Sequence, residues 1–205
     1  MKLITIFTVL LLTITTPTRA DSPNVILVMS DDQGWTQTGY YGHPIAGTPN
    51  LDDMANSGLR MDRFYAGAPF CVPSRATVLT GRTNARTGVL PGGAINKQEK
   101  ILATAFKEAG YATGHFGKWH LSGAEDRRDT AVPASNPHNP GEYGFDYWLS
   151  KSIQFNLDPI LSRNGVIEQF KGDGSEVIVD EALKFITEQS KKNKPFFVLV
   201  WYSTP

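Results

Sequence analysis

The sequence predicts an α/β fold in which a mostly parallel sheet carries helices on both faces. Two continuous apolar runs, NVILVMS at residues 24–30 and FFVLVWY at residues 196–202, are typical of strands buried on both sides. Stretches with helical spacing alternate with strand-like stretches between these two runs. Such alternation favours parallel strands joined by helical crossovers.

Proline and glycine punctuate the first half of the chain. Thr48 is a suitable cap and Pro49 suits the first turn of a helix that Gly58 follows. Gly81 closes a later helix in the same way. The elements predicted in this half are strands at 24–30 and 59–65 and helices at 48–55 and 74–79.

Helical spacing is clearest in the second half of the chain. Apolar residues recur at that spacing from Ile101 to Ala109, and Gly110 ends the helix before a strand-like stretch. Proline, asparagine and glycine mark a long loop at 131–144. The other elements predicted in this half are helices at 101–109 and 177–185 and strands at 111–116 and 196–202.

Composition narrows the class of protein without indicating a function. The 205 residues are 40% hydrophobic and 11% aromatic, which is enough for one domain core and excludes a disordered chain. The 20 basic residues balance the 20 acidic ones, so no overall charge favours nucleic acid as a partner. A single cysteine excludes an intrachain disulfide framework and a zinc site built from several cysteines.

Residues 1–20 have the pattern of an export signal. Lys2 gives a positive start, residues 3–14 are an uncharged apolar run, and residues 18–20 (TRA) suit a signal peptidase. The run is too short to span a hydrocarbon core about 30 Å thick, although a buried first helix or strand is the alternative. We therefore expect cleavage after Ala20, a mature domain at 21–205, and an exported protein without a membrane anchor, either periplasmic or secreted.

The C-terminal end of the sequence follows a predicted core strand directly. Only three residues follow the strand at 196–202, and the last of them is Pro205. Ligand sites of open α/β sheets form beyond the carboxyl ends of the strands. We therefore expect the chain to be the N-terminal part of a longer protein.

Two adjacent carboxylates, Asp31 and Asp32, follow the first apolar strand. Neighbouring carboxylates repel each other unless they are solvated or bind a cation, and hard divalent cations prefer carboxylate oxygens. A solvated turn is the simpler interpretation. Their place at the end of a buried strand makes a metal site an equally good one.

A lone cysteine, Cys71, lies between two prolines just ahead of a predicted helix. Such a cysteine is most often a small buried hydrophobe. A helix N-terminus, however, presents free N–H groups that attract anions. Arg75 lies one turn further along and could reach back with a planar, permanently charged group.

Lys118 and His120 follow the strand predicted at 111–116. Side chains in a strand alternate with period two, so the two residues would share a face. A cation and an imidazole together suit oxyanion binding and proton transfer. A surface lysine and a hydrogen-bonded core histidine form the alternative.

Residues 71–75 (CVPSR) followed by residues 79–82 (LTGR) resemble the signature of the sulfatase family. Three further stretches agree in order, and the resemblance covers the mature chain, which would correspond to the N-terminal part of a family of longer proteins. Those stretches are NVILVMSDDQG at 24–34, TPNLDDMANSGL at 48–59 and GKWHL at 117–121.

The resemblance implies an alkaline-phosphatase-like fold and hydrolysis of sulfate monoesters, on an aryl group or a glycan. A separate formylglycine-generating enzyme would convert Cys71 to formylglycine (3-oxoalanine), whose hydrate is the nucleophile. By the same resemblance, Asp31, Asp32 and modified Cys71 would bind one Ca²⁺, and Arg75 would hold the hydrate. Lys118 would bind a sulfate oxygen, and His120 would assist proton transfer.

Two other interpretations stay open at this point. Related proteins that carry formylglycine hydrolyse phosphorus esters, so a phosphomonoester or phosphonate ester hydrolase is the second enzyme class. An inactive, truncated sulfatase fragment is the third interpretation, because the family's remaining metal and substrate ligands are expected beyond Pro205.

Overall fold

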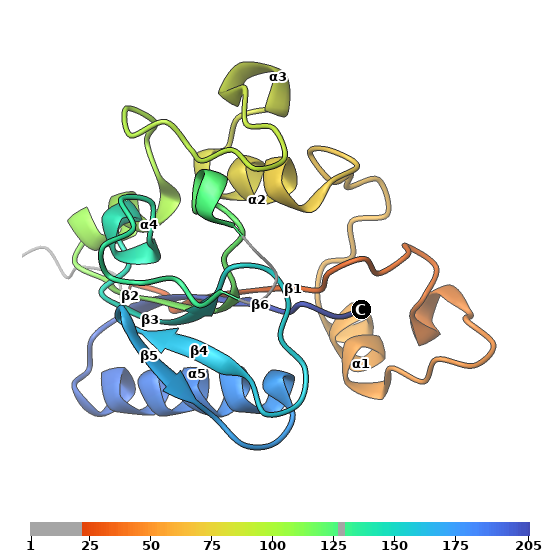
Figure 1. Cartoon of the computed structure of the whole chain (residues 1–205). Coiled ribbons are helices and arrows are strands. Elements are labelled where there is room, and N and C mark those ends of the chain that lie inside the picture. Colours follow the sequence, from red (N-terminus) through yellow and green to blue (C-terminus); the bar gives the residue numbers. More distant parts are fainter. Residues whose placement is uncertain (1–21, 127–129) are drawn as a thin grey trace, which may run out of the picture.

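The computed structural model describes residues 22–126 and 130–205 (Figure 1). The expected signal peptide at 1–20 lies outside the described residues. Within the described parts, no helix has the length and apolar character needed to cross a membrane.

One six-stranded sheet organises the fold, in the order β1-β6-β2-β3-β4-β5. The pairs β1–β6, β6–β2 and β2–β3 are parallel, and the last two pairs are antiparallel. The expectation of a mostly parallel sheet is therefore confirmed. The strands are β1 (Val25–Met29), β2 (Ala112–Lys118), β3 (Tyr147–Lys151), β4 (Ile160–Arg163), β5 (Val166–Gln169) and β6 (Phe196–Trp201).

Helices cover both faces of this sheet. The long helix α5 lies along one face, and α2 and α4 lie on the other (Figure 1). Short 3-10 turns occupy residues 39–41, 123–125 and 140–143. The helices are α1 (Pro49–Ser57), α2 (Cys71–Thr80), α3 (Asn84–Thr87), α4 (Leu102–Glu108) and α5 (Gly174–Lys191).

The alternation of side chains along β6 divides the interior into two cores. Phe197, Leu199 and Trp201 pack in the cluster on the side of α2 and α4. Phe196 and Val198 pack in the cluster on the side of α5. All six residues of β6 are buried, as expected of a strand that is covered on both faces.

The strand predicted at 59–65 does not form. This stretch is turn and irregular backbone, with Leu59 86% and Phe64 78% exposed. It pairs with no strand of the sheet, and strand propensity alone does not hold a strand without neighbours to pair with.

The antiparallel end of the sheet was missed by the sequence analysis. Strands β3, β4 and β5 are short, and only part of each is apolar, so their pattern gives little periodicity. Asp173 caps α5 by accepting from the Ser175 and Glu176 N–H groups, which starts that helix earlier than the apolar spacing indicates. The loop predicted at 131–144 includes the turn at 140–143 and the buried Tyr143.

Candidate active site

The carboxyl ends of β1, β6 and β2 meet at one edge of the sheet because these strands are parallel. Asp31 follows β1, and Lys118 is the last residue of β2. Helix α2 begins with Cys71 at this edge, earlier than expected, because Pro73 fits its first turn. The edge is where ligands of open α/β sheets bind.

Three charged side chains form a buried cluster there. Asp31, Arg75 and Lys118 are 5%, 1% and 3% exposed. Arg75 Nη2 lies 3.0 Å from Asp31 Oδ1, and the Lys118 ammonium donates to Asp31 Oδ2. Arg75 Nη1 also donates to the Lys118 carbonyl oxygen at 2.8 Å. Buried charges are tolerated only when paired in this way.

The cluster keeps the Asp31 carboxylate ionised. Burial alone would raise the pKa of Asp31. The hydrogen bond from Lys118 and the charges of Arg75 and Lys118 outweigh burial and hold this pKa below its ordinary value. The Arg75 guanidinium donates to Asp31 and to the end of β2. The sequence had led us to expect that it would reach back to Cys71 instead.

Cys71 instead lies against a histidine. Its Sγ is 3.2 Å from His120 Nδ1, and the backbone N–H of His120 donates to the Ser152 carbonyl oxygen at 2.7 Å. His120 has a φ of 54°, so it lies beyond the regular alternation of β2. Burial, reinforced by the charges of Lys118 and Arg75, lowers the pKa of His120 to about 4. The imidazole is therefore neutral near pH 7 and can accept a proton.

The two adjacent carboxylates differ sharply. Asp31 is buried, whereas Asp32 is exposed and has a left-handed φ of 57°. Both line a pocket of about 320 Å³ together with Cys71, Ser74 and Arg75. The pocket thus collects the acidic and the nucleophilic candidates at one place.

The residues of this pocket can supply only part of a calcium coordination shell. Carboxylate oxygens suit Ca²⁺, which takes about six to eight oxygen ligands. Among the described residues, no group of three or more histidine, cysteine, aspartate or glutamate side chains could hold a metal. Both oxygens of Asp31 are also engaged by cations. The carboxylates of Asp31 and Asp32 therefore match calcium in the kind of their oxygens, and the ligand set expected from the sequence stays a prediction.

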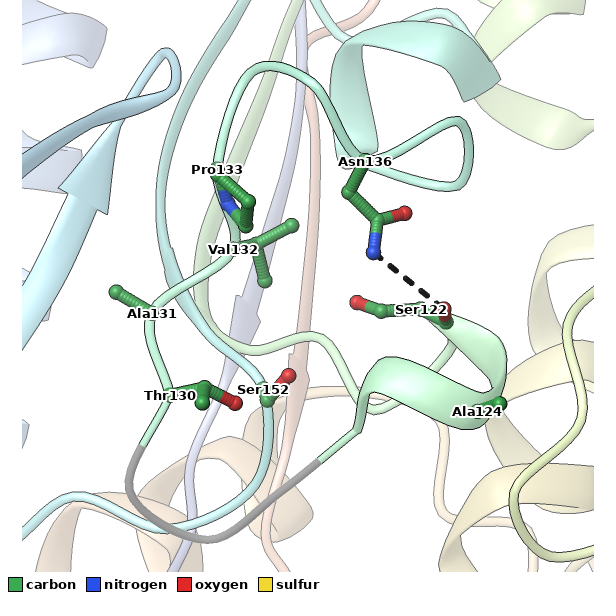
Figure 2. Close-up of a pocket in the computed structure, with 8 residues that line it drawn as sticks. All are labelled: Ser122, Ala124, Thr130, Ala131, Val132, Pro133, Asn136 and Ser152. Carbon is green, nitrogen blue, oxygen red and sulfur yellow. Dashed lines mark hydrogen bonds between the residues drawn. The ribbon is translucent and has the colours of Figure 1, made fainter.

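A second pocket, of about 310 Å³, is lined by residues that follow β2 and β3 in the chain, among them Ser122 and Ser152 (Figure 2). Its other lining residues are also uncharged. Behind it, Asp126 accepts from Ser152 Oγ and from the Ser122 N–H, both at 2.9 Å. Burial raises the pKa of Asp126 to about 6. Ser152, which lines this pocket, accepts a hydrogen bond from the backbone N–H of His120 through its carbonyl oxygen.

The structure thus brings Asp31, Cys71, Arg75, Lys118 and His120 to one edge, with Asp32 at its exposed rim. Their chemical roles stay predictions. The sequence analysis missed Trp201 and Ser152, although Trp201 lies near the carboxyl end of the strand predicted at 196–202 and so should lie at this edge.

Comparison with known proteins gives a consistent family. The model of the family described as Sulfatase matches residues 23–205. An N-acetylgalactosamine-6-sulfatase of Canis lupus familiaris is 33% identical over 213 residues, covering 87% of this chain and 38% of that protein. An arylsulfatase A of Bos taurus is 45% identical over 109 residues, covering 50% of this chain and 22% of that protein.

A solved structure supports the same assignment. A protein crystallised in complex with its substrate D-glucosamine-2-N,6-O-disulfate superposes with a TM-score of 0.74 and 32% identity. The match covers 89% of this chain and 34% of that one. The chain therefore spans roughly a third of the length of these relatives. The family match over nearly all described residues, on this fold, shows that the chain belongs to the sulfatase family.

Proposed function

We propose that the protein is a sulfuric ester hydrolase that cleaves sulfate monoesters with a formylglycine made from Cys71. The observation that supports this most is the placement of Cys71. It is the first residue of α2, where N–H groups are free, and it contacts a neutral histidine at 3.2 Å. Arg75 lines the same pocket as Cys71, and Lys118 pairs there with Asp31.

The proposed reaction uses the hydrated aldehyde as a nucleophile. One hydroxyl of the hydrate at residue 71 attacks sulfur, the ester S–O bond breaks, and the alcohol leaves with a proton. His120 then accepts the proton of the second hydroxyl, the C–O bond to sulfate breaks, and the aldehyde returns. Addition of water restores the hydrate and completes the cycle.

The charged cluster orients the ester. Lys118 would share its ammonium between Asp31 and a sulfate oxygen, so that negative charge is stabilised in a dry setting. Arg75 donates to both Asp31 and the end of β2 and so fixes their positions relative to each other. Ca²⁺, when bound by Asp31, Asp32 and residue 71, would polarise the sulfate as a Lewis acid.

We further propose a glycan as the organic part of the ester. One relative is an N-acetylgalactosamine-6-sulfatase, and one similar structure holds a glucosamine disulfate as its substrate, so both are described with sulfated sugars. The uncharged pocket lined by Ser122 and Ser152 lies next to His120 and has room for a neutral ring (Figure 2). An aryl sulfate would make little use of these hydroxyl groups.

The test coexpresses the full chain with a formylglycine-generating enzyme. Conversion should make the tryptic peptide that contains Cys71 about 18 Da lighter than the thiol form. Converted protein should release sulfate from D-galactose 6-sulfate and from 4-nitrophenyl sulfate, but little phosphate from 4-nitrophenyl phosphate. A retained thiol, or faster phosphate release, would contradict the proposal, and Cys71→Ser is the matched control where the host converts only cysteine.

Export is a separate proposal. It is supported by the charge and apolar pattern of residues 1–20. N-terminal sequencing of the protein recovered outside the cytoplasm should begin at Asp21. Recovery of an intact Met1 only from the cytoplasm would contradict it.

A further inference from the structure

Hydrogen bonds hold only part of the Arg75 guanidinium. Its two terminal nitrogens donate to Lys118 O and Asp31 Oδ1 at 2.8 and 3.0 Å. Its Nε–H group is buried and has no hydrogen-bond partner. Nη2 also donates to the Tyr202 carbonyl oxygen at 3.4 Å. Hydrogen bonds therefore hold the terminal nitrogens but not the Nε–H edge, and a contact with the face of the group would add restraint.

The indole of Trp201 supplies that restraint. Arg75 Cζ lies 4.9 Å from the ring centroid, and both residues are almost completely buried. A cation over an aromatic face is attracted by the ring quadrupole, most strongly where water is excluded. The Trp201 ring N–H is also buried and has no hydrogen-bond partner. The ring contacts the Arg75 guanidinium through its face.

Trp201 is itself held in place. His115 meets its ring edge-on, with centroids 5.1 Å apart at 88°, and Trp119 stacks at 6.3 Å and 18°. Gly117 on β2 has a φ of 108°, and a Cβ there would lie 2.0 Å from the Trp201 carbonyl oxygen. Only glycine allows this approach, so the backbones of β2 and β6 are locked together beside the ring.

We propose that Trp201 is a positioning residue of the active site, which fixes the Arg75 guanidinium and through it Asp31 and Lys118. A tryptophan that only fills the core could be replaced by leucine at the expense of packing alone. A positioning role requires an aromatic face, so phenylalanine should serve where leucine does not. The structural part of this inference is independent of the proposed function, and only its catalytic consequence rests on it.

The first readout is the ¹⁵N–¹H resonance of the Arg75 Nε–H group in the labelled full chain. In the wild type and in Trp201→Phe it should be shifted by the ring current and exchange slowly with water. In Trp201→Leu the shift should be lost, and exchange should become at least about tenfold faster, as expected when a desolvated cation–π contact is removed. Trp148→Leu, which removes another buried tryptophan, 4% exposed against 0% for Trp201, from β3, is the matched control and should keep the signal.

The second readout is turnover of 4-nitrophenyl sulfate by converted protein. Trp201→Leu should lower kcat about tenfold with KM nearly unchanged, and Trp201→Phe should stay within about threefold of the wild type. If Trp201→Leu unfolds, Trp201→Met replaces it, because methionine fills irregular space without an aromatic face.

Two results would overturn the inference. One is an unchanged Arg75 signal in Trp201→Leu, and the other is an equal loss in Trp148→Leu, which would indicate general loosening of the core. A wild type without turnover would count against the proposed function, while the Arg75 signal would still decide the role of Trp201.

Discussion

Every residue of β2 and β6 is buried, whereas none of the nine residues of α1 is buried. The segment at 32–70 that contains α1 lies to the side of the sheet (Figure 1). It exposes large apolar side chains, among them Trp35, Ile45 and Tyr65. The candidate site lies where the sheet and the segment at 32–70 meet, because Asp31 lies at the sheet edge and Asp32 is the first residue of the segment.

The comparison shows that adjacent residues of one type can have different physical roles. Asp31 neutralises two buried cations, so its contacts stabilise the fold. Asp32 makes no ion pair with the described residues and is exposed. Asp32 therefore has no paired cation among the described residues of the shared pocket, whereas Asp31 would meet a ligand there while still paired with Arg75 and Lys118.

The largest effect is expected at the point where the segment joins α2. Cys71→Ala removes the atom that becomes the nucleophile, so turnover of a sulfate ester by converted protein should fall by at least about a thousandfold. The fold should be unaffected, as circular dichroism would show. Substantial residual turnover would mean that another group attacks sulfur.

The two neighbouring aspartates give the sharpest test of the comparison. Asp31→Asn leaves Arg75 and Lys118 buried without a carboxylate, and should lower the free energy of unfolding by about 3–5 kcal/mol. Asp32→Asn, at an exposed position, should change it by less than about 0.5 kcal/mol. Urea titrations of both variants at pH 7 measure the difference. Equal effects would mean that the buried cluster is not what distinguishes the two regions.

The sheet region should also respond to pH through His115. Burial, together with the charge of Arg75, holds the pKa of His115 well below its usual range. The unfolded chain binds a proton below pH 6.5 and the folded chain does not, so stability is present above pH 6.5 and falls as the pH drops. The loss should approach about 1.4 kcal/mol per pH unit.

Urea midpoints between pH 7.5 and 5.5 measure this slope. His115→Gln should reduce this slope, since glutamine does not titrate, while His120, whose pKa is also lowered, keeps its own share of the pH dependence. An unchanged slope in that variant would assign the pH dependence to other groups.

The smallest effects are expected in the segment at 32–70. Leu59→Ser and Phe64→Ser act on exposed side chains and should change the free energy of unfolding by less than about 0.5 kcal/mol. Leu199→Ala in β6 should cost about 2–5 kcal/mol by opening a cavity. Thermal unfolding of the three variants provides the comparison. A large loss in either serine variant would show that the segment packs in solution.

The sequence by itself determined the elements whose pattern is local. Continuous apolar runs identified β1 and β6, the helix predicted at 74–79 lies within α2, and the motif at residues 71–82 singled out its cysteine. Periodicity reports which faces are buried, and a motif reports which chemistry is carried. Periodicity and motifs can be recognised without knowledge of long-range contacts, so the fold class could be predicted from the sequence.

Only the tertiary structure decided the partners within the site. Arg75 and Lys118 meet Asp31 across 44 and 87 positions of sequence, and no local pattern indicates that pairing. The same holds for Trp201 under Arg75, and for the strand expected at 59–65, which has no edge to pair with. Pairing of strands and burial of charges depend on which segments the whole chain brings together, because each is stable only when its distant partner is present.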